Sequence, residues 1–306
     1  MDPRYCIVIA GPTGVGKTSM AAALARRWGT EVLSADSRQC YAEMNIGVAR
    51  PTADEMQGIP HHFIASHVIS TPVNAAGFEQ YALSVADEVF KKNPVLVVTG
   101  GTGLYIKALL EGIDTMPPIP DAIRERVRDL HAREGISGLL AAFPKDDPFL
   151  SGNETSNPHR VMRALEVRLS TGRSIRELQT GAHAQRGFKT LYIALDLPRE
   201  ELYARIDARV NDMMHRGLLE EVKRLVDLKD NVSLQTVGYK EIFEHLEGKH
   251  DLRRAVELIQ QHTRNYAKRQ LTWFRAVEGV EWFSPGDVEA VVARVADFTG
   301  ISPRPI

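Results

Sequence analysis

The sequence predicts an α/β fold, in which helices cover a parallel β-sheet and a helical insertion interrupts the chain. Short apolar runs alternate with helical patterns from the N-terminus to about Thr99. The β pattern then disappears between Pro117 and about Gly187, and it returns at Leu191. Strands that alternate with helices are typical of a doubly wound parallel sheet.

The elements of the first half follow in a regular order. The run Tyr5–Ala10 predicts a strand, and Ser19–Trp28, closed by Gly29, predicts a helix. Glu31–Ala35 is expected to be a second strand. A helical pattern covers Phe78–Lys91, and Pro94–Thr99 has the continuous apolar character of a buried parallel strand.

The rest of the chain is predicted to complete the sheet. Leu191–Asp196 predicts a strand, and Arg199–Val226 and Leu252–Phe274 predict long helices. We therefore expect a core formed by residues 1–114 and 188–306, the second part carrying C-terminal helices. Residues 115–187 are expected to form the helical insertion.

A glycine loop joins the first strand to the first helix. Gly11-x-x-x-x-Gly16-Lys17-Thr18 matches the full phosphate-loop (P-loop) pattern in the required context. Backbone N–H groups at a helix N-terminus face an anion, the Lys17 ammonium contacts a terminal phosphate, and the Thr18 hydroxyl binds Mg²⁺. The pattern predicts a P-loop NTPase-like core, and the predicted diphosphate-binding residues are Gly11, Thr13, Gly14, Val15, Gly16, Lys17 and Thr18.

The acid that completes a nucleotide hydrolase is not evident. A P-loop ATPase normally has a strand that ends in Asp and holds the metal. The best candidate strand instead runs into Thr99-Gly100-Gly101-Thr102. Asp196 also ends a strand, but the Pro and acids that follow it favour a helix start. This pattern weakens ATP hydrolysis and leaves another diphosphate open.

Two further strand ends are expected at the edge that carries the P-loop. Asp36 follows the second strand, and Gly100–Tyr105 follows the third, so parallel strands would bring all three segments to one crevice. Asp36 has two interpretations, a helix N-cap before Ser37 or a catalytic carboxylate.

Seven motifs, taken in order, resemble the tRNA dimethylallyltransferase family, also called tRNA isopentenyltransferases or IPP transferases. They are the P-loop, Asp36-Ser37-Arg38-Gln39-x-Tyr41, Pro60-His61-His62, Gly100-Gly101-Thr102-Gly103-Leu104-Tyr105, Arg160-x-x-Arg163-Ala164-Leu165-Glu166, Val237-Gly238-Tyr239 and Lys268-Arg269-Gln270-x-Thr272-Trp273-Phe274. Each is weak by itself, but their order and spacing are specific. The resemblance covers residues 11 to 275.

The resemblance implies transfer of a dimethylallyl group from dimethylallyl diphosphate to N6 of the adenosine immediately 3′ of the anticodon, position 37 of tRNA. Asp36 would take the proton from the adenine amine. Lys17, the loop amides, Thr102 and an arginine would hold the diphosphate, with Mg²⁺ as cofactor. The resemblance assigns this arginine to Arg205 or Arg209, with Arg209 first. Their i, i+4 spacing lets both face one crevice, although a solvated helix face is the alternative from the residues alone.

Two basic zones suggest an RNA surface in a chain whose formal net charge is −1. Asn157–Lys189 and Lys249–Arg275 each contain seven basic residues against two acidic ones. The target adenine must leave its stack to reach a buried allylic carbon. By resemblance the helical insertion holds the anticodon stem-loop, and the tRNA-binding residues are Asp36, Ser37, Arg38, Gln39, Thr102, Arg124, His159, Arg160, Val161, Met162 and Arg163. An ordinary charged helix surface is the alternative for any one arginine.

The remaining motifs are assigned no metal-binding or catalytic role. His61 and His62 lack a Cys or acid at ligand spacing, so we do not expect zinc there. The family usually carries an acid where this chain has Ala65, which leaves the role of that loop open. The aromatic residues Tyr192, Trp273, Phe274 and Trp282 are expected to be core.

The composition excludes several classes and leaves two alternative functions. The chain has 306 residues, 43% of them hydrophobic and 25% charged, and it lacks apolar runs long enough for a membrane span. Two cysteines and the absence of a signal-peptide pattern predict a cytoplasmic protein, which we expect to be a monomer. A P-loop small-molecule kinase or prenyltransferase acting on free nucleotides stays open, as does an RNA-binding module without transfer activity.

Overall fold

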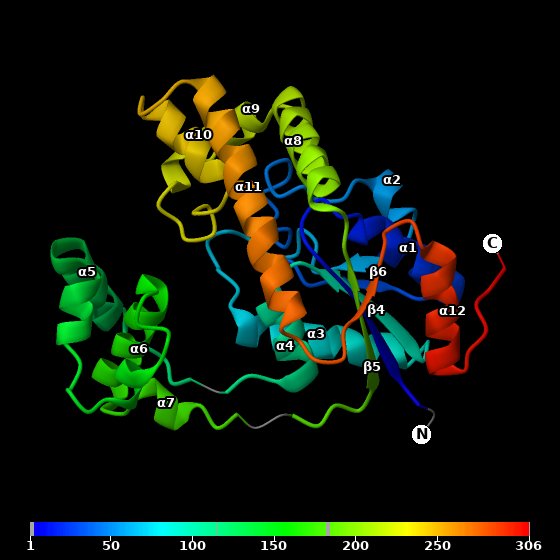
Figure 1. Ribbon diagram of the computed structural model, residues 1–306, viewed down its shortest axis with the longest axis horizontal. Coiled ribbons are helices and arrows are strands. Elements are labelled where there is room, and N and C mark those ends of the chain that lie inside the picture. The colour runs from blue at the N-terminus through cyan, green and yellow to red at the C-terminus, as the bar shows by residue number, and fades with distance from the viewer. Residues whose placement is uncertain (1–2, 115, 182–183, 306) are drawn as a thin grey trace. The chain divides into compact units, whose positions relative to one another are not determined.

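A computed structural model describes residues 3–114, 116–181 and 184–305 (Figure 1). The chain divides into two compact units. One comprises Met1–Glu111 with Gln185–Ile306, and the other comprises Gly112–Ala184. Thr115, the first residue of the predicted insertion, lies outside the described residues.

The first unit is built on a parallel sheet with the strand order β3-β2-β4-β1-β5-β6. All neighbouring strands are parallel, so their carboxyl ends meet at one edge. The predicted α/β class and its P-loop-like sheet are confirmed. The strands are β1 (Tyr5–Ala10), β2 (Val32–Ser34), β3 (His61–His62), β4 (Val95–Gly100), β5 (Lys189–Leu195) and β6 (Glu281–Phe283).

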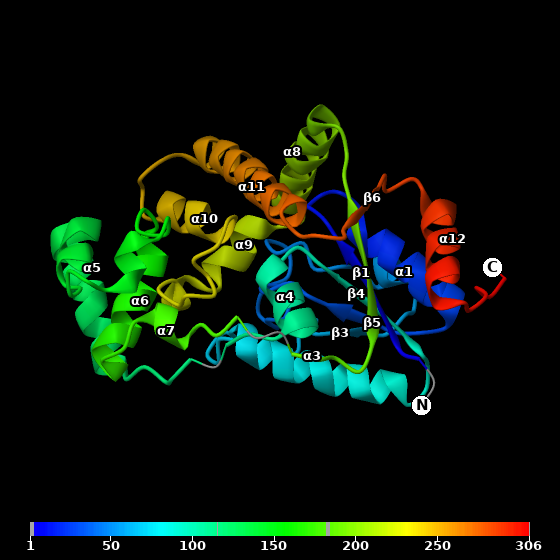
Figure 2. The same ribbon diagram turned by 60° about the horizontal axis from the view of Figure 1, so that its bottom comes forward.

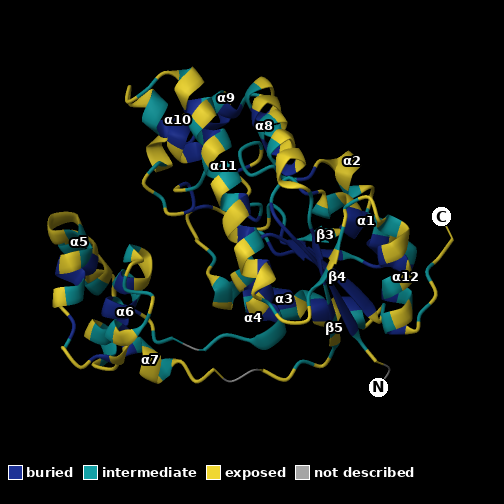
Figure 3. Ribbon diagram, in the orientation of Figure 1, coloured by how far each residue is buried: buried dark blue, intermediate teal, exposed yellow. Residues whose placement is uncertain are grey.

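Side chains of the central strand alternate between two layers of helices. Tyr5, Ile7 and Ile9 pack with residues of α1 (Lys17–Trp28) and α12 (Val288–Thr299). The alternate positions of β1 pack with α3 (Ala75–Phe90) and α4 (Gly103–Glu111). Because β1 is buried on both faces, its sequence is apolar throughout (Figures 2 and 3).

Helices that follow β5 contribute to both of these cores. They are α8 (Arg199–His215), α9 (Leu218–Lys223), a 3₁₀ turn (Val226–Leu228), α10 (Tyr239–Leu246) and α11 (Leu252–Arg275). The predicted single helix Arg199–Val226 was wrong, because the chain bends at Gly217. This glycine adopts φ 96°, a conformation that a residue with a side chain rarely adopts.

The second unit is helical and has its own core. It contains α5 (Asp121–Ala141), a 3₁₀ turn (Pro148–Ser151), α6 (Pro158–Thr171) and α7 (Ile175–Leu178). Non-helical dihedral angles at Gly135 break α5. Its core includes the fully buried Val127, Leu139, Val161 and Leu165.

Three short elements and two tryptophans also differ from the sequence predictions. The edge strands β3 and β6 and the short α2 (Ala53–Met56) were not predicted, since each is too short to show a period. Trp273 and Trp282 are 36% and 37% exposed, so placing them in the core was wrong. Trp282 lies on an edge strand, and Trp273 lies near the C-terminal end of α11. None of the described helices combines the length and apolar character needed to cross a membrane.

Candidate active site

The P-loop forms the first wall of a cavity at the carboxyl edge of the sheet. Gly14 and Gly16 adopt φ 83° and 106°, which turns the chain sharply after β1. Gly16 precedes α1 and supplies no side-chain cap. The first N–H groups of α1 are therefore available to an anion, as the pattern predicted.

Lys17 lies inside this loop. Its Nζ donates a hydrogen bond to the carbonyl oxygen of Pro12 at 2.8 Å. Burial lowers the pKa of Lys17 to about 8, and the positive charge of Arg209 acts in the same direction, whereas the nearby negative charge of Asp36 opposes it. A diphosphate entering the loop would stabilise the protonated ammonium.

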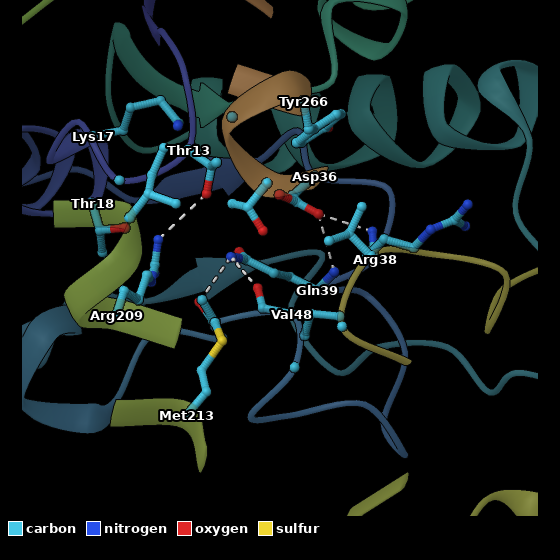
Figure 4. A pocket seen from close by; sticks show the side chains of 18 of the residues that line it. Thr13, Lys17, Thr18, Asp36, Arg38, Gln39, Val48, Arg209, Met213 and Tyr266 are labelled. Carbon is cyan, nitrogen blue, oxygen red and sulfur yellow. Dashed lines mark hydrogen bonds between the residues drawn. The ribbon is translucent and has the colours of Figure 1, made fainter. Parts of the chain in front are cut away.

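Helix α8 places a guanidinium opposite the P-loop. Arg209 Nη1 lies 3.4 Å from Thr13 Oγ1, and the Arg209 side chain faces the cavity (Figure 4). Burial lowers the pKa of Arg209 from its usual value. Arg205, one turn earlier, also lines the cavity but is exposed and pairs with Glu201 at 2.7 Å. Of the two candidates, Arg209 has the geometry of an anion-binding group.

Asp36 lies across the cavity, just after β2. Its Oδ1 accepts hydrogen bonds from the backbone N–H groups of Arg38 at 2.9 Å and Gln39 at 3.2 Å. These residues form a turn and not a helix, so Asp36 closes a turn instead of capping a helix. Its other oxygen, Oδ2, accepts no hydrogen bond from the described residues. The helix N-cap interpretation of Asp36 is therefore wrong, and Oδ2 stays available for the catalytic interpretation.

The loop after β4 approaches the Asp36 turn. Thr102 Oγ1 accepts a hydrogen bond from the Ser37 N–H at 3.1 Å and donates one to Ser37 Oγ at 3.3 Å. The N–H of Thr102 donates to the carbonyl of Ala35 at 3.2 Å. Gly100 packs so closely on Ala35 that a Cβ would collide with its backbone. The Gly-Gly-Thr sequence therefore positions Thr102 beside Asp36.

Parts of these segments line one cavity of about 440 Å³, but the predicted catalytic residue Thr102 is not among its lining residues. Lys17, Thr18 and Arg209 lie at one side, and Asp36, Arg38 and Gln39 lie at the other (Figure 4). The remaining wall carries both polar side chains, among them Glu55, Thr236 and Thr263, and apolar ones. The apolar side chains are those of Val48, Ala49, Ile206, Val210, Met213, Val237 and Ile259.

Sequence reasoning missed two residues of α11 that shape this cavity. Gln270 Oε1 accepts a hydrogen bond from the Thr13 N–H, and Gln270 Nε2 donates one to the Gly101 carbonyl at 2.8 Å. Tyr266, one turn earlier, also lines the cavity, and burial raises the pKa of its hydroxyl to about 12. Gln270 belongs to the recognised Lys-Arg-Gln motif, which was the available signal.

The cavity lining supplies few protein ligands for a metal ion. Strand β4 ends at Thr99 and Gly100 without an acid, and Asp196 pairs with Arg275 at 3.1 Å outside the cavity lining. The part of the chain that the structure describes contains no group of three His, Cys, Asp or Glu residues suited to a metal. Thr18 lines the cavity beside Lys17. This donor set suits Mg²⁺, which usually binds diphosphate oxygens and water with only one or two protein ligands.

The predicted RNA-binding residues of the second unit are partly exposed. His159 and Arg160 lie on the first turn of α6, and Arg160 pairs with Glu154 at 2.7 Å. Arg163 is 40% exposed and lies 3.4 Å from Glu166. Arg124 is exposed beside Asp121, and Met162 is partly buried. Val161 is fully buried among Val127 and Leu165, so its side chain has no free surface for RNA.

Not every basic residue counted in the two basic zones contributes to an exposed basic surface. Arg186 is largely buried, pairs with Glu79 at 2.5 Å and donates to two carbonyls of α4. It anchors the chain and does not belong to a free basic surface. Lys268 and Arg269 are exposed and form no ion pair with the described residues, while Arg269 lies over the Tyr266 ring at 5.7 Å.

The family comparisons agree with this geometry. A model of the IPP transferase family matches residues 39–277, and a model of the AAA ATPase family matches residues 7–61, which include the P-loop. The tRNA dimethylallyltransferase of Cytophaga hutchinsonii is 43% identical over 94% of this chain and 95% of its own length. The tRNA dimethylallyltransferase 1 of Bacteroides thetaiotaomicron is 40% identical over 91% of each chain.

Two solved structures share the fold over nearly the whole chain. The tRNA isopentenylpyrophosphate transferase from Bacillus halodurans is similar with a TM-score of 0.73 and 33% identity, covering 97% of each chain. A eukaryotic dimethylallyltransferase acting on tRNA has a TM-score of 0.78 and 26% identity, covering 99% of this chain and 81% of that one.

Proposed function

The chain belongs to the IPP transferase family, and from this premise we propose that it transfers the dimethylallyl group of dimethylallyl diphosphate to tRNA. The acceptor is N6 of adenosine 37, immediately 3′ of the anticodon, and the products are diphosphate and N6-dimethylallyladenosine. The observation that carries this proposal is the shared cavity. A P-loop and an arginine face a carboxylate there, and β4 ends without the acid that would complete an ATPase.

The leaving group is held by the P-loop side of the cavity. As the bond between C1 and oxygen breaks, negative charge grows on the diphosphate. Lys17, Thr18 and Arg209 line the side of the cavity where we place the diphosphate, beside the free N–H groups of the loop. Preorganised donors of this kind contribute roughly 3 to 4 kcal/mol each to transition-state stabilisation.

The Thr18 hydroxyl is proposed to hold Mg²⁺ together with the diphosphate oxygens. When bound, the ion neutralises charge on the leaving diphosphate.

The acceptor side is assigned to Asp36. Nitrogen N6 attacks C1, the N6–C1 bond forms as the C1–O bond breaks, and the N6 proton passes to Asp36 Oδ2. The fixed Oδ1 holds the carboxylate in place, because it accepts two backbone N–H groups. Thr102 and Ser37 lie beside this carboxylate and are proposed to orient the adenine.

The apolar side chains of the cavity suit the allylic carbons. In a cation-like transition state, water would compete with the adenine for C1. The side chains of Val48, Val210, Met213 and Ile259 line the cavity and leave less room for water. The five-carbon group is therefore expected to lie against these side chains.

The RNA surface is proposed to include exposed basic residues of both units. Lys268 and Arg269 lie on α11 near the cavity residue Gln270, and Arg160 and Arg163 lie on α6. Such residues position a phosphate backbone without reading its sequence. We propose further that the protein acts as a monomer on cytoplasmic tRNA.

A transfer assay with unmodified tRNA tests the proposal. Dimethylallyl diphosphate labelled in its alkyl group should label tRNA in the presence of Mg²⁺. Replacing adenosine 37 with guanosine should abolish the signal. Equal labelling of both tRNAs would contradict the assigned acceptor.

A further inference from the structure

A buried carboxylate outside the cavity lining is bound to one of the cavity loops. Glu221 on α9 is 3% exposed. Its Oε2 accepts a hydrogen bond from the Ile46 N–H at 2.8 Å, and its Oε1 accepts one from the Gly47 N–H at 3.0 Å. The hydroxyl of Tyr239 donates to Oε1 at 2.5 Å.

No cation pairs with Glu221 in the described part of the chain. Burying a carboxylate without a counter-ion is costly unless hydrogen bonds satisfy its oxygens. Here backbone N–H groups of a loop supply most of them. The side chain therefore fixes a segment that lies far from it in sequence, more than it stabilises its own helix.

The loop that Glu221 holds is constrained from several sides. Ala49 adopts φ 49°, a left-handed conformation that is unfavourable for alanine. The Arg50 guanidinium donates to the backbone carbonyls of Tyr41, Ala42 and Met44. A Cβ at Gly47 would meet the Tyr239 ring at 2.5 Å, so only glycine fits this contact.

The same loop contacts the residues around Asp36. Gln39 Nε2 donates to the carbonyls of Val48 at 3.3 Å and Ala49 at 3.0 Å (Figure 4). The backbone N–H of Gln39 donates to Asp36 Oδ1. A continuous set of contacts therefore runs from Glu221 through residues 46–49 and Gln39 to Asp36.

We infer that Glu221 is a positioning residue for prenyl transfer, acting through the 46–49 loop and Gln39 on Asp36 and the adenine beside it. This inference rests on the proposed function. Lys17 and Arg209, the proposed diphosphate ligands, lie on the other side of the cavity. Loss of Glu221 should therefore slow the transfer step and leave diphosphate binding nearly unchanged.

The test compares Glu221→Gln with the matched control Glu220→Gln. Glutamine keeps the shape of the glutamate side chain, but its NH₂ group replaces one carboxylate oxygen and faces the N–H and O–H donors of Ile46, Gly47 or Tyr239. We expect kcat to fall about 10- to 100-fold, as for a small misplacement of reacting groups. The KM for dimethylallyl diphosphate should stay within about twofold. Glu220 is exposed and pairs with Lys223, so its variant should behave as wild type.

A double-mutant cycle with Gln39→Ala separates positioning from general damage. If Glu221 acts through Gln39, adding Glu221→Gln to Gln39→Ala should lower kcat by no more than about twofold. If the fold-decrease in kcat of the double variant equals the product of the two single-variant decreases, the inference is overturned. An unchanged kcat in Glu221→Gln would also overturn it. If Glu221→Gln does not fold, Tyr239→Phe takes its place in the double-mutant cycle, because it removes the hydroxyl that donates to Glu221 and keeps the Glu221 carboxylate. An inactive wild-type protein would instead contradict the proposed function.

Discussion

The Oε1 atom of Gln270 accepts a hydrogen bond from the backbone N–H of Thr13 at 2.9 Å, although the two residues are 257 positions apart. The amide of the same side chain donates to the carbonyl of Gly101. One glutamine on α11 therefore connects the P-loop to the loop after β4. The relative position of the two loops depends on this contact.

Replacing Gln270 with leucine should destabilise the first unit. The N–H of Thr13 and the carbonyl of Gly101 would lose their partner, at a cost of about 1–3 kcal/mol for each buried group left unsatisfied. Denaturant unfolding measures this loss. The control Gln260→Leu removes hydrogen bonds of 3.4 Å to the Asp207 carbonyl and 3.2 Å to Asn211 Oδ1, neither of them fully buried, and should change stability little. Equal stability of the two variants would contradict the bridging role.

Replacing Asp36 with asparagine should slow the transfer reaction and spare binding. Asparagine keeps an oxygen for the two backbone N–H groups but cannot accept the N6 proton. We expect turnover to fall at least about tenfold, with diphosphate and tRNA affinities unchanged. Single-turnover kinetics with both substrates saturating provide the measurement. Wild-type turnover in this variant would remove Asp36 from proton transfer.

Arg209→Ala and Arg205→Ala should differ strongly, although both residues lie on one face of α8. Loss of Arg209 removes a cation that faces the leaving group, and we expect kcat/KM for dimethylallyl diphosphate to fall about 10²- to 10³-fold. Arg205 is exposed and paired with Glu201, so its loss should change kcat/KM less than about threefold. A larger defect for Arg205 would reverse the assignment.

The pH dependence of dimethylallyl diphosphate use should report on Lys17. Burial lowers the pKa of this lysine to about 8. Below that pH the ammonium is charged and attracts the diphosphate, whereas above it the neutral amine does not. We therefore expect kcat/KM to decline as pH rises through about 8. In Lys17→Arg the guanidinium stays protonated, so the decline should shift to higher pH. A flat wild-type profile up to pH 10 would contradict this role.

Arg163→Ala should weaken tRNA binding and reduce its dependence on salt. The logarithm of the binding constant falls as the logarithm of the salt concentration rises, and each lost phosphate contact makes this slope less steep by about one. The control Lys91→Ala changes an exposed lysine outside both basic zones and should leave the slope unchanged. Identical slopes for Arg163→Ala and wild type would show that Arg163 belongs to an ordinary charged surface.

Local patterns predicted the groups at the strand ends. The P-loop, Asp36 and the Gly-Gly-Thr segment each follow a strand directly, and parallel strands place their carboxyl ends together. Helical spacing could not choose between Arg205 and Arg209, because both lie on one face of α8. The choice depends on which turn of the helix passes Thr13, which is a tertiary contact.

Tertiary contacts also explain what the sequence could not predict. Glu221 lies in an ordinary Glu-Glu pair, and only the structure distinguishes it from the exposed Glu220. Arg186 contributes to a basic count in the sequence but is paired with Glu79, 107 residues away. Trp273 is an aromatic residue of the kind usually found in a core, but its position on α11 leaves its side chain partly exposed.

The most direct test follows the alkyl group and the γ-phosphate separately. Unmodified tRNA and Mg²⁺ are incubated with dimethylallyl diphosphate labelled in its alkyl carbons, and a parallel reaction contains ATP labelled at the γ-phosphate. Our account predicts alkyl label in tRNA, at adenosine 37, and no phosphate transfer. Phosphate moving from ATP to a small acceptor, with no alkyl label in tRNA, would contradict the account and identify the P-loop as a kinase site.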